Sequence, residues 1–248
     1  MKIKLVTIDF WNTLYDSSNN EQRDEYRNNS LIEIASKYNK FLTDKEIGTA
    51  ISETWRYFGH HWKINHRTPN AKECVTHLFS NLGFKHIESD IEYVTNVFIN
   101  SVAKHPPVLL EDAKDTVIEL NKHFKIALIS DTGFSPGSIL RQIIKNDGLL
   151  DYFDSFSFSN ETGVAKPHKI AFQAPLKSLN TYAKNAIHIG DIESTDVIGA
   201  KNQGMHAIRF LADKNNKINL DNPEITAADF ELHSWNEVRN LLLNSLIF

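Results

Sequence analysis

The second part of this chain alternates between two hydrophobic rhythms, and this alternation restricts the fold more than any other feature of the sequence. From Glu111 onward, segments with apolar residues at three- and four-residue spacing, as in amphipathic helices, are separated by short runs rich in apolar, aromatic or β-branched residues. These strand-like runs are 125–130 (KIALIS), 153–159 (FDSFSFS), 186–190 (AIHIG), 206–210 (HAIRF) and 229–232 (DFEL), preceded near the N-terminus by 2–9 (KIKLVTID). Strands that alternate with helices form parallel sheets with helices on both faces. We therefore expect an α/β fold built on a doubly wound parallel sheet.

A different pattern fills the chain between the first strand and the alternating region. Four segments in this stretch have helical periodicity, and they cover residues 21–38, 44–62, 71–84 and 89–103. Asp44 and Asp90 stand near plausible helix starts, and the prolines of HPPVL (105–109) end the block. We expect a small all-helical domain over residues 16–105, inserted into an α/β core that is formed by residues 1–15 and 106–248.

Composition narrows the classes of function. The 248 residues are 41% hydrophobic and carry a formal net charge of -4, which lacks the basic excess typical of nucleic-acid binding. No apolar run approaches the roughly 20 residues of a membrane helix, and Asp9 interrupts the N-terminal run before it could form a signal-peptide core. The single cysteine, Cys74, lies on the apolar stripe of a predicted helix, so we expect neither a disulfide nor a thiol nucleophile. These features indicate a cytoplasmic protein without nucleic-acid or membrane partners.

Polar residues follow several of the predicted strands. Asp9 ends the first strand, Ser130 and Asp131 follow KIALIS, and Asp191 follows AIHIG. In a doubly wound sheet these positions share the carboxyl edge, where ligands bind. Lys166, in GVAKPHK, stands at the start of a predicted helix and can reach the same edge.

The residue types at this edge suit phosphoryl chemistry. Carboxylates such as Asp9, Asp191 and Asp196 repel one another when they converge, and a hard divalent cation such as Mg²⁺ relieves that repulsion. A lysine, a hydroxyl and a metal around an aspartate form a site in which cations neutralise phosphoryl oxygens while the aspartate attacks phosphorus. Each residue alone has a simpler explanation, such as capping a helix, closing a turn or lying in solvent. Their joint placement favours the site.

Four ordered segments are similar to the motifs of the haloacid dehalogenase-like superfamily. They are Asp9 to Thr13, Ser130, the pair Lys166 and Pro167, and GDIESTD at 190–196. The predicted helical insert resembles the cap domain of that superfamily, and the resemblance continues through residues 152–172 and 200–205, so that it covers almost the whole chain. It implies a Rossmann-like core, a cap that opens and closes over it, and a hydrolase that acts on a small molecule, as a monomer or a homodimer.

The resemblance assigns a role to each matching residue. Asp9 would be the nucleophile that forms an aspartyl-phosphate. Ser130 would hydrogen-bond the phosphoryl oxygens, and Lys166 would hold nucleophile and phosphate together. Asp191 would bind Mg²⁺ with Asp9, while Asp196 would bind or orient the ion from the other side of its loop.

Trp11 departs from the pattern of the phosphatases in this superfamily. They normally have a second aspartate here, which protonates the leaving alcohol and then activates water. An indole has no titratable proton, although the backbone carbonyl of Trp11 could still contact the metal, as in the superfamily. A positioned acid or base contributes about 10²- to 10⁴-fold to a rate. We therefore expect an atypical Mg²⁺-dependent phosphatase, acting on a small phosphorylated metabolite, whose acid or base comes from another residue; the candidates are Asp16, Asp131, Glu161, His60 and His61.

Two other functions stay open. Hydrolysis of a carbon–halogen or carbon–phosphorus bond needs no acid at Trp11, and the dehalogenases resemble this chain in having an aromatic residue there. They lack paired aspartates like those of GDIESTD, however, and no Schiff-base lysine of a phosphonate-cleaving member is recognisable. The third reading is a non-catalytic protein that binds a phosphorylated ligand.

Three residues are expected to contact substrate: Trp11, Asn12, which stands where many members have glycine, and Asp131. Residues 55–69 (WRYFGHHWKINHRTP) are the candidate specificity segment of the cap. Their aromatic and basic groups suit an acidic or ring-containing substrate, or form the core of the helical domain itself.

Overall fold

The computed structural model describes residues 2–213 and 225–244. Contacts divide these residues into two compact units, each described here by itself. The core unit comprises the residues up to Ser18, Pro107–Asp131 and those from Ile144 onward, and the helical unit comprises Asn19–Pro106 and Thr132–Ile143. The segment Thr132–Ile143, which the sequence pattern places in the α/β core, thus groups with the helices. None of the described helices is long and apolar enough to span a membrane.

The core unit contains a parallel sheet of six strands, in the order β3-β2-β1-β4-β5-β6. The strands are β1 (Leu5–Ile8), β2 (Lys125–Ser130), β3 (Ser155–Phe158), β4 (Ala186–Gly190), β5 (His206–Phe210) and β6 (Phe230–Leu232). The predicted doubly wound α/β fold is confirmed. The strand order reverses between β1 and β4, where a sheet of this topology opens a crevice at its carboxyl edge.

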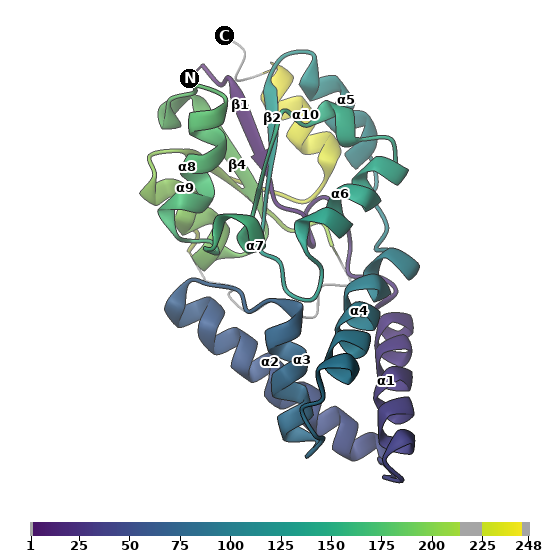
Figure 1. The fold of residues 1–248 in the computed structure, drawn as a ribbon. Coiled ribbons are helices and arrows are strands. Elements are labelled where there is room, and N and C mark those ends of the chain that lie inside the picture. The colour runs from purple at the N-terminus through teal and green to yellow at the C-terminus, as the bar shows by residue number, and fades with distance from the viewer. Residues whose placement is uncertain (1, 214–224, 245–248) are drawn as a thin grey trace. The chain divides into compact units, whose positions relative to one another are not determined.

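Helices cover both faces of this sheet, as Figure 1 shows. Helices α8 (Lys169–Ser178) and α9 (Ile198–Asn202) lie on one face, and α5 (Ala113–Asn121) and α10 (Trp235–Asn244) lie on the other. All residues of β1 and β4 are buried for this reason, which explains their continuous apolar sequence. The α8 face has a cluster of buried apolar residues, namely Leu5, Ala127, Ile129, Ala171, Phe172, Leu176, Ala186, Val197, Ala200, Met205 and Ala207.

The helical unit packs four helices around its own apolar core. They are α1 (Asn20–Lys37), α2 (Asp44–Asn65), α3 (Ala71–Asn81) and α4 (Glu88–Lys104). Capping boxes begin two of them, because Thr43 and Glu46 bond reciprocally at the start of α2, and Asn70 and Glu73 do so at the start of α3. Phe134 joins the buried core of these helices from the segment Thr132–Ile143.

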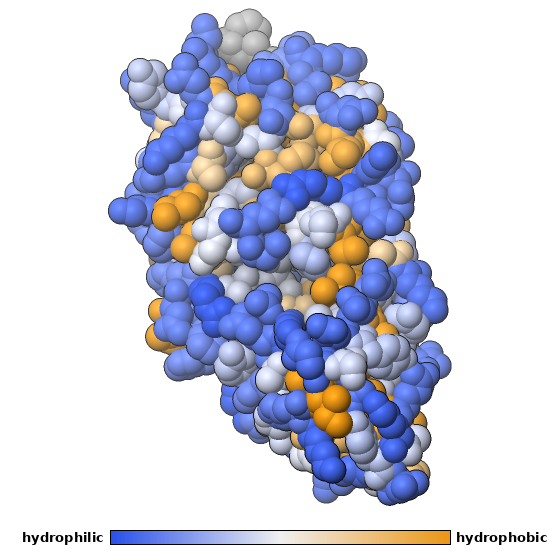
Figure 2. Space-filling model, in the orientation of Figure 1, coloured by the Kyte–Doolittle hydropathy of each residue, from blue (hydrophilic) through white to orange (hydrophobic). Residues whose placement is uncertain are grey.

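Shorter elements complete the described chain. They are α6 (Gly137–Asn146), α7 (Ser159–Thr162), the 3₁₀ turns Leu150–Tyr152 and Ala183–Asn185, and a π-helical turn at Glu193–Val197. The face drawn in Figure 2 is mostly hydrophilic, with small separate hydrophobic patches.

Candidate active site

Three buried aspartates converge at the carboxyl edge of the sheet. Asp9 follows β1, and its backbone N–H donates to the carbonyl of Ile189 in β4 (2.9 Å), which extends the sheet by one residue. Asp191 follows β4, and Asp196 lies in the turn after it. Carboxylate oxygens of Asp9, Asp191 and Asp196 all lie within 4.8 Å of one another.

Gly190 permits this convergence. A Cβ atom at Gly190 would lie 2.4 Å from the Cγ of Asp196, closer than real contacts allow. Asp196 does not cap a helix, because no side chain caps α9 and the Asp196 carboxylate instead accepts the N–H of Ile192, four residues earlier (3.2 Å). The sharp turn thus directs Asp196 back toward the end of the strand.

Lys166 joins two of the aspartates. Its Nζ donates to Oδ1 of Asp9 (2.5 Å) and to Oδ1 of Asp196 (2.6 Å), and the lysine is 3% exposed. Asp131 supports the lysine backbone, because its Oδ1 accepts the N–H of Lys166 (2.9 Å). Residues 9, 131, 166 and 196 therefore lie in one bonded group.

Burial and charge set the ionisation of this group. Burial raises the pKa of Asp9 well above its usual range, although the nearby charge of Lys166 acts in the opposite direction. Burial and the negative charge of Asp196 together raise the pKa of Asp191 to about 7. Burial alone would raise the pKa of Asp196 too, but Lys166 and His188 hold it below the usual range. Within the described cluster one lysine thus faces three carboxylates, a charge imbalance that a cation would relieve.

The turn after β1 brings Asn12 to the same place. Asn12 has a φ of 55°, in the left-handed region that glycine and asparagine adopt most readily, and this explains why Asn can replace the glycine of related motifs. Its Nδ2 donates to Oδ2 of Asp191 (3.3 Å). Trp11 is half-buried and packs edge-on against Phe10, with ring centroids 4.9 Å apart.

Two other motif residues are buried near the ends of their strands. Ser130 is 1% exposed at the end of β2, and its hydroxyl donates weakly to the carbonyl of Asp131 (3.4 Å). Thr13 is fully buried, and its carbonyl accepts the indole N–H of Trp235 (2.9 Å), which fastens the turn after Asp9 to α10.

Three of the five candidates for a replacement acid or base have informative contacts. Nδ1 of His61 lies 2.9 Å from Nδ2 of Asn65, one turn further along α2. Oδ1 of Asp16 accepts the N–H (3.0 Å) and the hydroxyl (2.6 Å) of Ser18 and the N–H of Val108 (2.9 Å), so this carboxylate ties together two chain segments. Asp131 is bonded to the cluster through Lys166. Glu161 lies in α7, while His60 and His61 lie in α2 of the helical unit.

His188 belongs to the cluster, although the sequence pattern alone did not identify it. Its Nε2 lies 2.9 Å from Oδ1 of Asp196, and the residue is 1% exposed in β4. The signal was present, because an imidazole in the otherwise apolar run AIHIG needs a hydrogen-bond partner.

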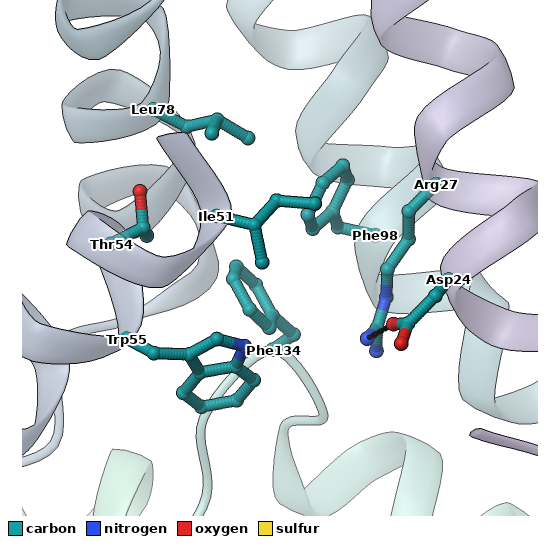
Figure 3. Close-up of a pocket in the computed structure, with 8 residues that line it drawn as sticks. All are labelled: Asp24, Arg27, Ile51, Thr54, Trp55, Leu78, Phe98 and Phe134. Atoms are coloured by element: carbon teal, nitrogen blue, oxygen red, sulfur yellow. Dashed lines mark hydrogen bonds and ion pairs between the residues drawn. The ribbon is translucent and has the colours of Figure 1, made fainter. Parts of the chain in front are cut away.

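The helical unit has a small pocket that the candidate specificity segment helps to line. Figure 3 shows its residues Asp24, Arg27, Ile51, Thr54, Trp55, Leu78, Phe98 and Phe134. The ring of Trp55 packs against that of Phe134 (centroids 5.3 Å apart), and the Arg27 guanidinium lies 5.2 Å from the Phe134 ring. The remaining cavity is about 10 Å³, the room of a single water molecule. These side chains form core packing within the helical unit, and the pocket has no room for a metabolite.

Several known proteins are similar to this chain in sequence. A model of the haloacid dehalogenase-like hydrolases matches residues 3–204. Glyceraldehyde 3-phosphate phosphatase of Pyrococcus furiosus is 32% identical over 113 residues, 45% of this chain and 46% of that protein. Pyrimidine 5'-nucleotidase YjjG of Escherichia coli is 31% identical over 151 residues, 60% of this chain and 63% of that protein. The match therefore spans less than two thirds of either relative.

A solved structure shares the fold along nearly the whole chain. The HAD-hydrolase YfnB of Bacillus subtilis, solved with magnesium bound, aligns with a TM-score of 0.66 over 98% of this chain and 100% of its own, at 17% identity. At this identity the likeness concerns the fold.

Proposed function

Because the chain belongs to the haloacid dehalogenase-like hydrolase family, we propose that it is a Mg²⁺-dependent phosphatase that acts through an aspartyl-phosphate on a small phosphorylated metabolite. The observation that carries the proposal is the buried lysine bridge between Asp9 and Asp196, with Asp191 beside it. A buried cluster of like charges costs stability, and its retention is explained by chemistry rather than by folding. The two named phosphatase relatives support a phosphate ester as substrate.

The donor set fits Mg²⁺. Asp9, Asp191 and the backbone carbonyl of Trp11 would hold the ion, since oxygen ligands suit it. Asp196 would orient the site from outside, because its two oxygens already accept four hydrogen bonds. When bound, Mg²⁺ would neutralise charge on the phosphoryl oxygens. The magnesium found in the YfnB structure supports this assignment.

The residues of the chain then have distinct roles. Lys166 holds Oδ1 of Asp9, which leaves Oδ2 to attack phosphorus. Ser130 donates its hydroxyl to a phosphoryl oxygen, and Lys166 stabilises the charge that develops there. The departing oxygen needs a proton that Trp11 cannot supply, and Asp131 is the candidate that the contacts support best, because it is bonded to Lys166.

Phosphate release tests the proposal. The protein is incubated, with Mg²⁺ or with chelator, with each of four substrates: glyceraldehyde 3-phosphate, a pyrimidine 5'-nucleotide, an aryl phosphate and acetyl phosphate. Release of chloride from 2-chloropropionate is the control for dehalogenase activity. We expect Mg²⁺-dependent phosphate release that Asp9→Asn abolishes, while the matched surface variant Asp115→Asn retains it. Release that persists in Asp9→Asn, or no release from any ester, would contradict the proposal; metal-independent chloride release would favour a dehalogenase instead.

Trp11→Asp tests the account of the missing acid. The variant restores a titratable group, so we expect turnover of alkyl phosphates to rise by about 10²- to 10⁴-fold. Turnover of acetyl phosphate should rise less, because its leaving group needs no proton and only the activation of water is improved. Circular dichroism confirms that the variant is folded. Unchanged alkyl phosphate turnover in the folded variant would show that another residue already supplies the full acid and base function.

A further inference from the structure

We infer that His188 is a positioning residue of this site, which fixes the carboxylate of Asp196 and, through it, the lysine that holds the nucleophile. The inference deepens the proposed function and rests on it for the Mg²⁺ site and for the kinetic readout. Its structural basis is a buried hydrogen-bonded chain that runs from Thr7 through His188 to Asp196 and Lys166.

The sheet register brings the first two members together. Thr7 of β1 pairs with His188 of β4, so their side chains share one face of the sheet. Oγ1 of Thr7 lies 2.8 Å from Nδ1 of His188, and Thr7 is fully buried. Phe172 of α8 covers the imidazole edge-on, with ring centroids 5.3 Å apart. The ring therefore has a fixed orientation and no contact with solvent.

The direction of the hydrogen bonds follows from the charge of Asp196. An ionised carboxylate can only accept, so Nε2 of His188 must carry the proton that is donated to Asp196. The Thr7 hydroxyl has one proton and two acceptors in reach, Nδ1 of His188 at 2.8 Å and the carbonyl of Ile187 at 3.4 Å. Burial lowers the pKa of His188, which favours the neutral ring, and its Nδ1, the nearer acceptor, then takes that proton. Thr7 thereby selects the tautomer that can serve Asp196.

The Asp196 carboxylate is fully occupied as a result. Lys166 and His188 both donate to Oδ1, while the N–H of Ile192 and the hydroxyl of Thr195 donate to Oδ2, each at 3.2 Å. A carboxylate offers about four acceptor positions, so four donors leave it no freedom to rotate. Without His188, Oδ1 would be held by the lysine alone, and Lys166 could move with Asp196 away from Asp9.

Pure packing would not select histidine at this position. The neighbouring β4 residues Ile187 and Ile189 are apolar and fully buried, and a leucine would fill comparable space without a polar group to satisfy. Removal of a group that hydrogen-bonds a metal ligand commonly changes metal affinity by about 10- to 100-fold. His188 acts one step further from the ion, through Asp196 and Lys166, so its effect should lie at the lower end of that range.

Matched substitutions separate positioning from packing. His188→Leu removes the donor at similar volume, and His188→Gln keeps an N–H donor within reach of Asp196. Mg²⁺ affinity is measured by calorimetry. The values of kcat and KM are measured with an ester that the native protein hydrolyses. We expect His188→Leu to weaken Mg²⁺ binding by about 10-fold and to lower kcat with little change in KM, whereas His188→Gln recovers most of both. His206→Leu, on neighbouring β5, is the control and should change neither.

Thr7→Val and the metal-free native protein keep the inference testable if His188→Leu does not fold. We expect Thr7→Val to weaken Mg²⁺ binding by a smaller factor, and long-range ¹H–¹⁵N spectra of the native protein to show a neutral imidazole protonated at Nε2. The inference would be overturned if a folded His188→Leu protein bound Mg²⁺ with native affinity, or if the Gln and Leu variants had equal defects. It would also be overturned by unchanged affinity in Thr7→Val, by a ring protonated at Nδ1, or by the absence of Mg²⁺ binding in the native protein. A native protein that binds Mg²⁺ but hydrolyses no ester would refute the phosphatase proposal alone, because the affinity arm still tests His188.

Discussion

Two lysine–aspartate contacts of this molecule have the same length and opposite surroundings. In the core unit Lys166 lies 2.5 Å from Asp9, with side chains that are 3% and 7% exposed. In the helical unit Lys37 also lies 2.5 Å from Asp90, but its side chain is 53% exposed. The lysine contact is equally short in both pairs and both carboxylates are buried, but only Lys37 is open to water. Their neighbours differ too, because Asp9 faces Asp191 and Asp196 whereas Asp90 accepts a hydrogen bond from Tyr38.

The difference shows that the burial of the whole cluster and its neighbouring charges, and not the lysine–aspartate distance alone, decide what such a pair does. The hydrogen bond from Lys37 holds the pKa of Asp90 below its usual range, whereas burial raises the pKa of Asp9 despite an equally close lysine. An exposed pair adds little to stability, and a buried one must overcome the cost of removing its charges from water. The Lys37 pair therefore belongs to the surface of a helix pair, and the Lys166 cluster is suited to binding and catalysis.

Removing each lysine should give the largest contrast. We expect Lys166→Met to lower the free energy of unfolding by about 3–5 kcal/mol, because it leaves buried carboxylates without their cation, and to reduce phosphatase turnover by at least about 10²-fold. Lys37→Met is the matched control and should cause a much smaller loss of stability with normal turnover. Urea denaturation without Mg²⁺ provides the measurement. Equal losses in the two variants would contradict the role assigned to burial.

Removing an aspartate from each region should change stability in opposite directions. Asp191→Asn relieves repulsion among the buried carboxylates, so the metal-free protein should melt roughly 2–4 °C higher, the shift that about 1 kcal/mol produces in a chain of this size. Asp90→Asn breaks the bonds from Lys37 and Tyr38 and should lower the melting temperature. Added Mg²⁺ should raise the melting temperature of the native protein and of Asp90→Asn, and should leave Asp191→Asn unchanged. Changes of the same sign in metal-free protein would refute the comparison.

Acid should remove the contribution of Asp90. Its folded pKa is depressed below the unfolded value near 3.8, so the carboxylate stabilises the fold above that value and the contribution is lost as pH falls through the folded pKa. The difference in melting temperature between the native protein and Asp90→Asn should therefore be constant from pH 7 to 5 and shrink below about pH 4. A difference that is independent of pH would show that the Asp90 contacts do not depend on its charge.

Cys74 should show the smallest effect on function. Cys74 is fully buried in the helical unit, and burial raises the pKa of its thiol to about 12. The thiol therefore stays neutral at ordinary pH, unlike the charged groups of the core cluster. A thiol reagent at pH 8 should react only as the protein unfolds, and Cys74→Ala should retain native turnover and Mg²⁺ affinity. Rapid labelling of the folded protein would place the thiol in solvent.

Local sequence signals predicted much of the fold. The bounds of β2, β4 and β5 coincide with the runs KIALIS, AIHIG and HAIRF, because strands covered on both faces are continuously apolar. The aspartates of the cluster were recognisable because each follows a strand end or lies in the motif after one. Helix α2 begins at the predicted Asp44, where a capping box fixes the start.

Features that depend on distant parts of the chain could not be read in this way. The role inferred for His188 depends on its register with Thr7, 181 residues away, and on a turn that directs Asp196 back toward the strand. Phe134 follows a predicted core strand closely, and no local pattern shows that it belongs to the helical unit, where its ring packs with Trp55 and Phe98.

The place of Phe134 also limits how the molecule can be divided. Joining Ser18 directly to Pro107 would delete α1 to α4 of the helical unit as one continuous segment. The cut would leave Thr132–Ile143 behind, with an aromatic ring that is 6% exposed in the intact protein and would then lack every partner in its cluster. A minimal core of this protein therefore requires a redesigned segment after Asp131 in addition to the deletion. An ancestor that gained or lost the helices between Ser18 and Pro107 would have had to change the segment after Asp131 as well.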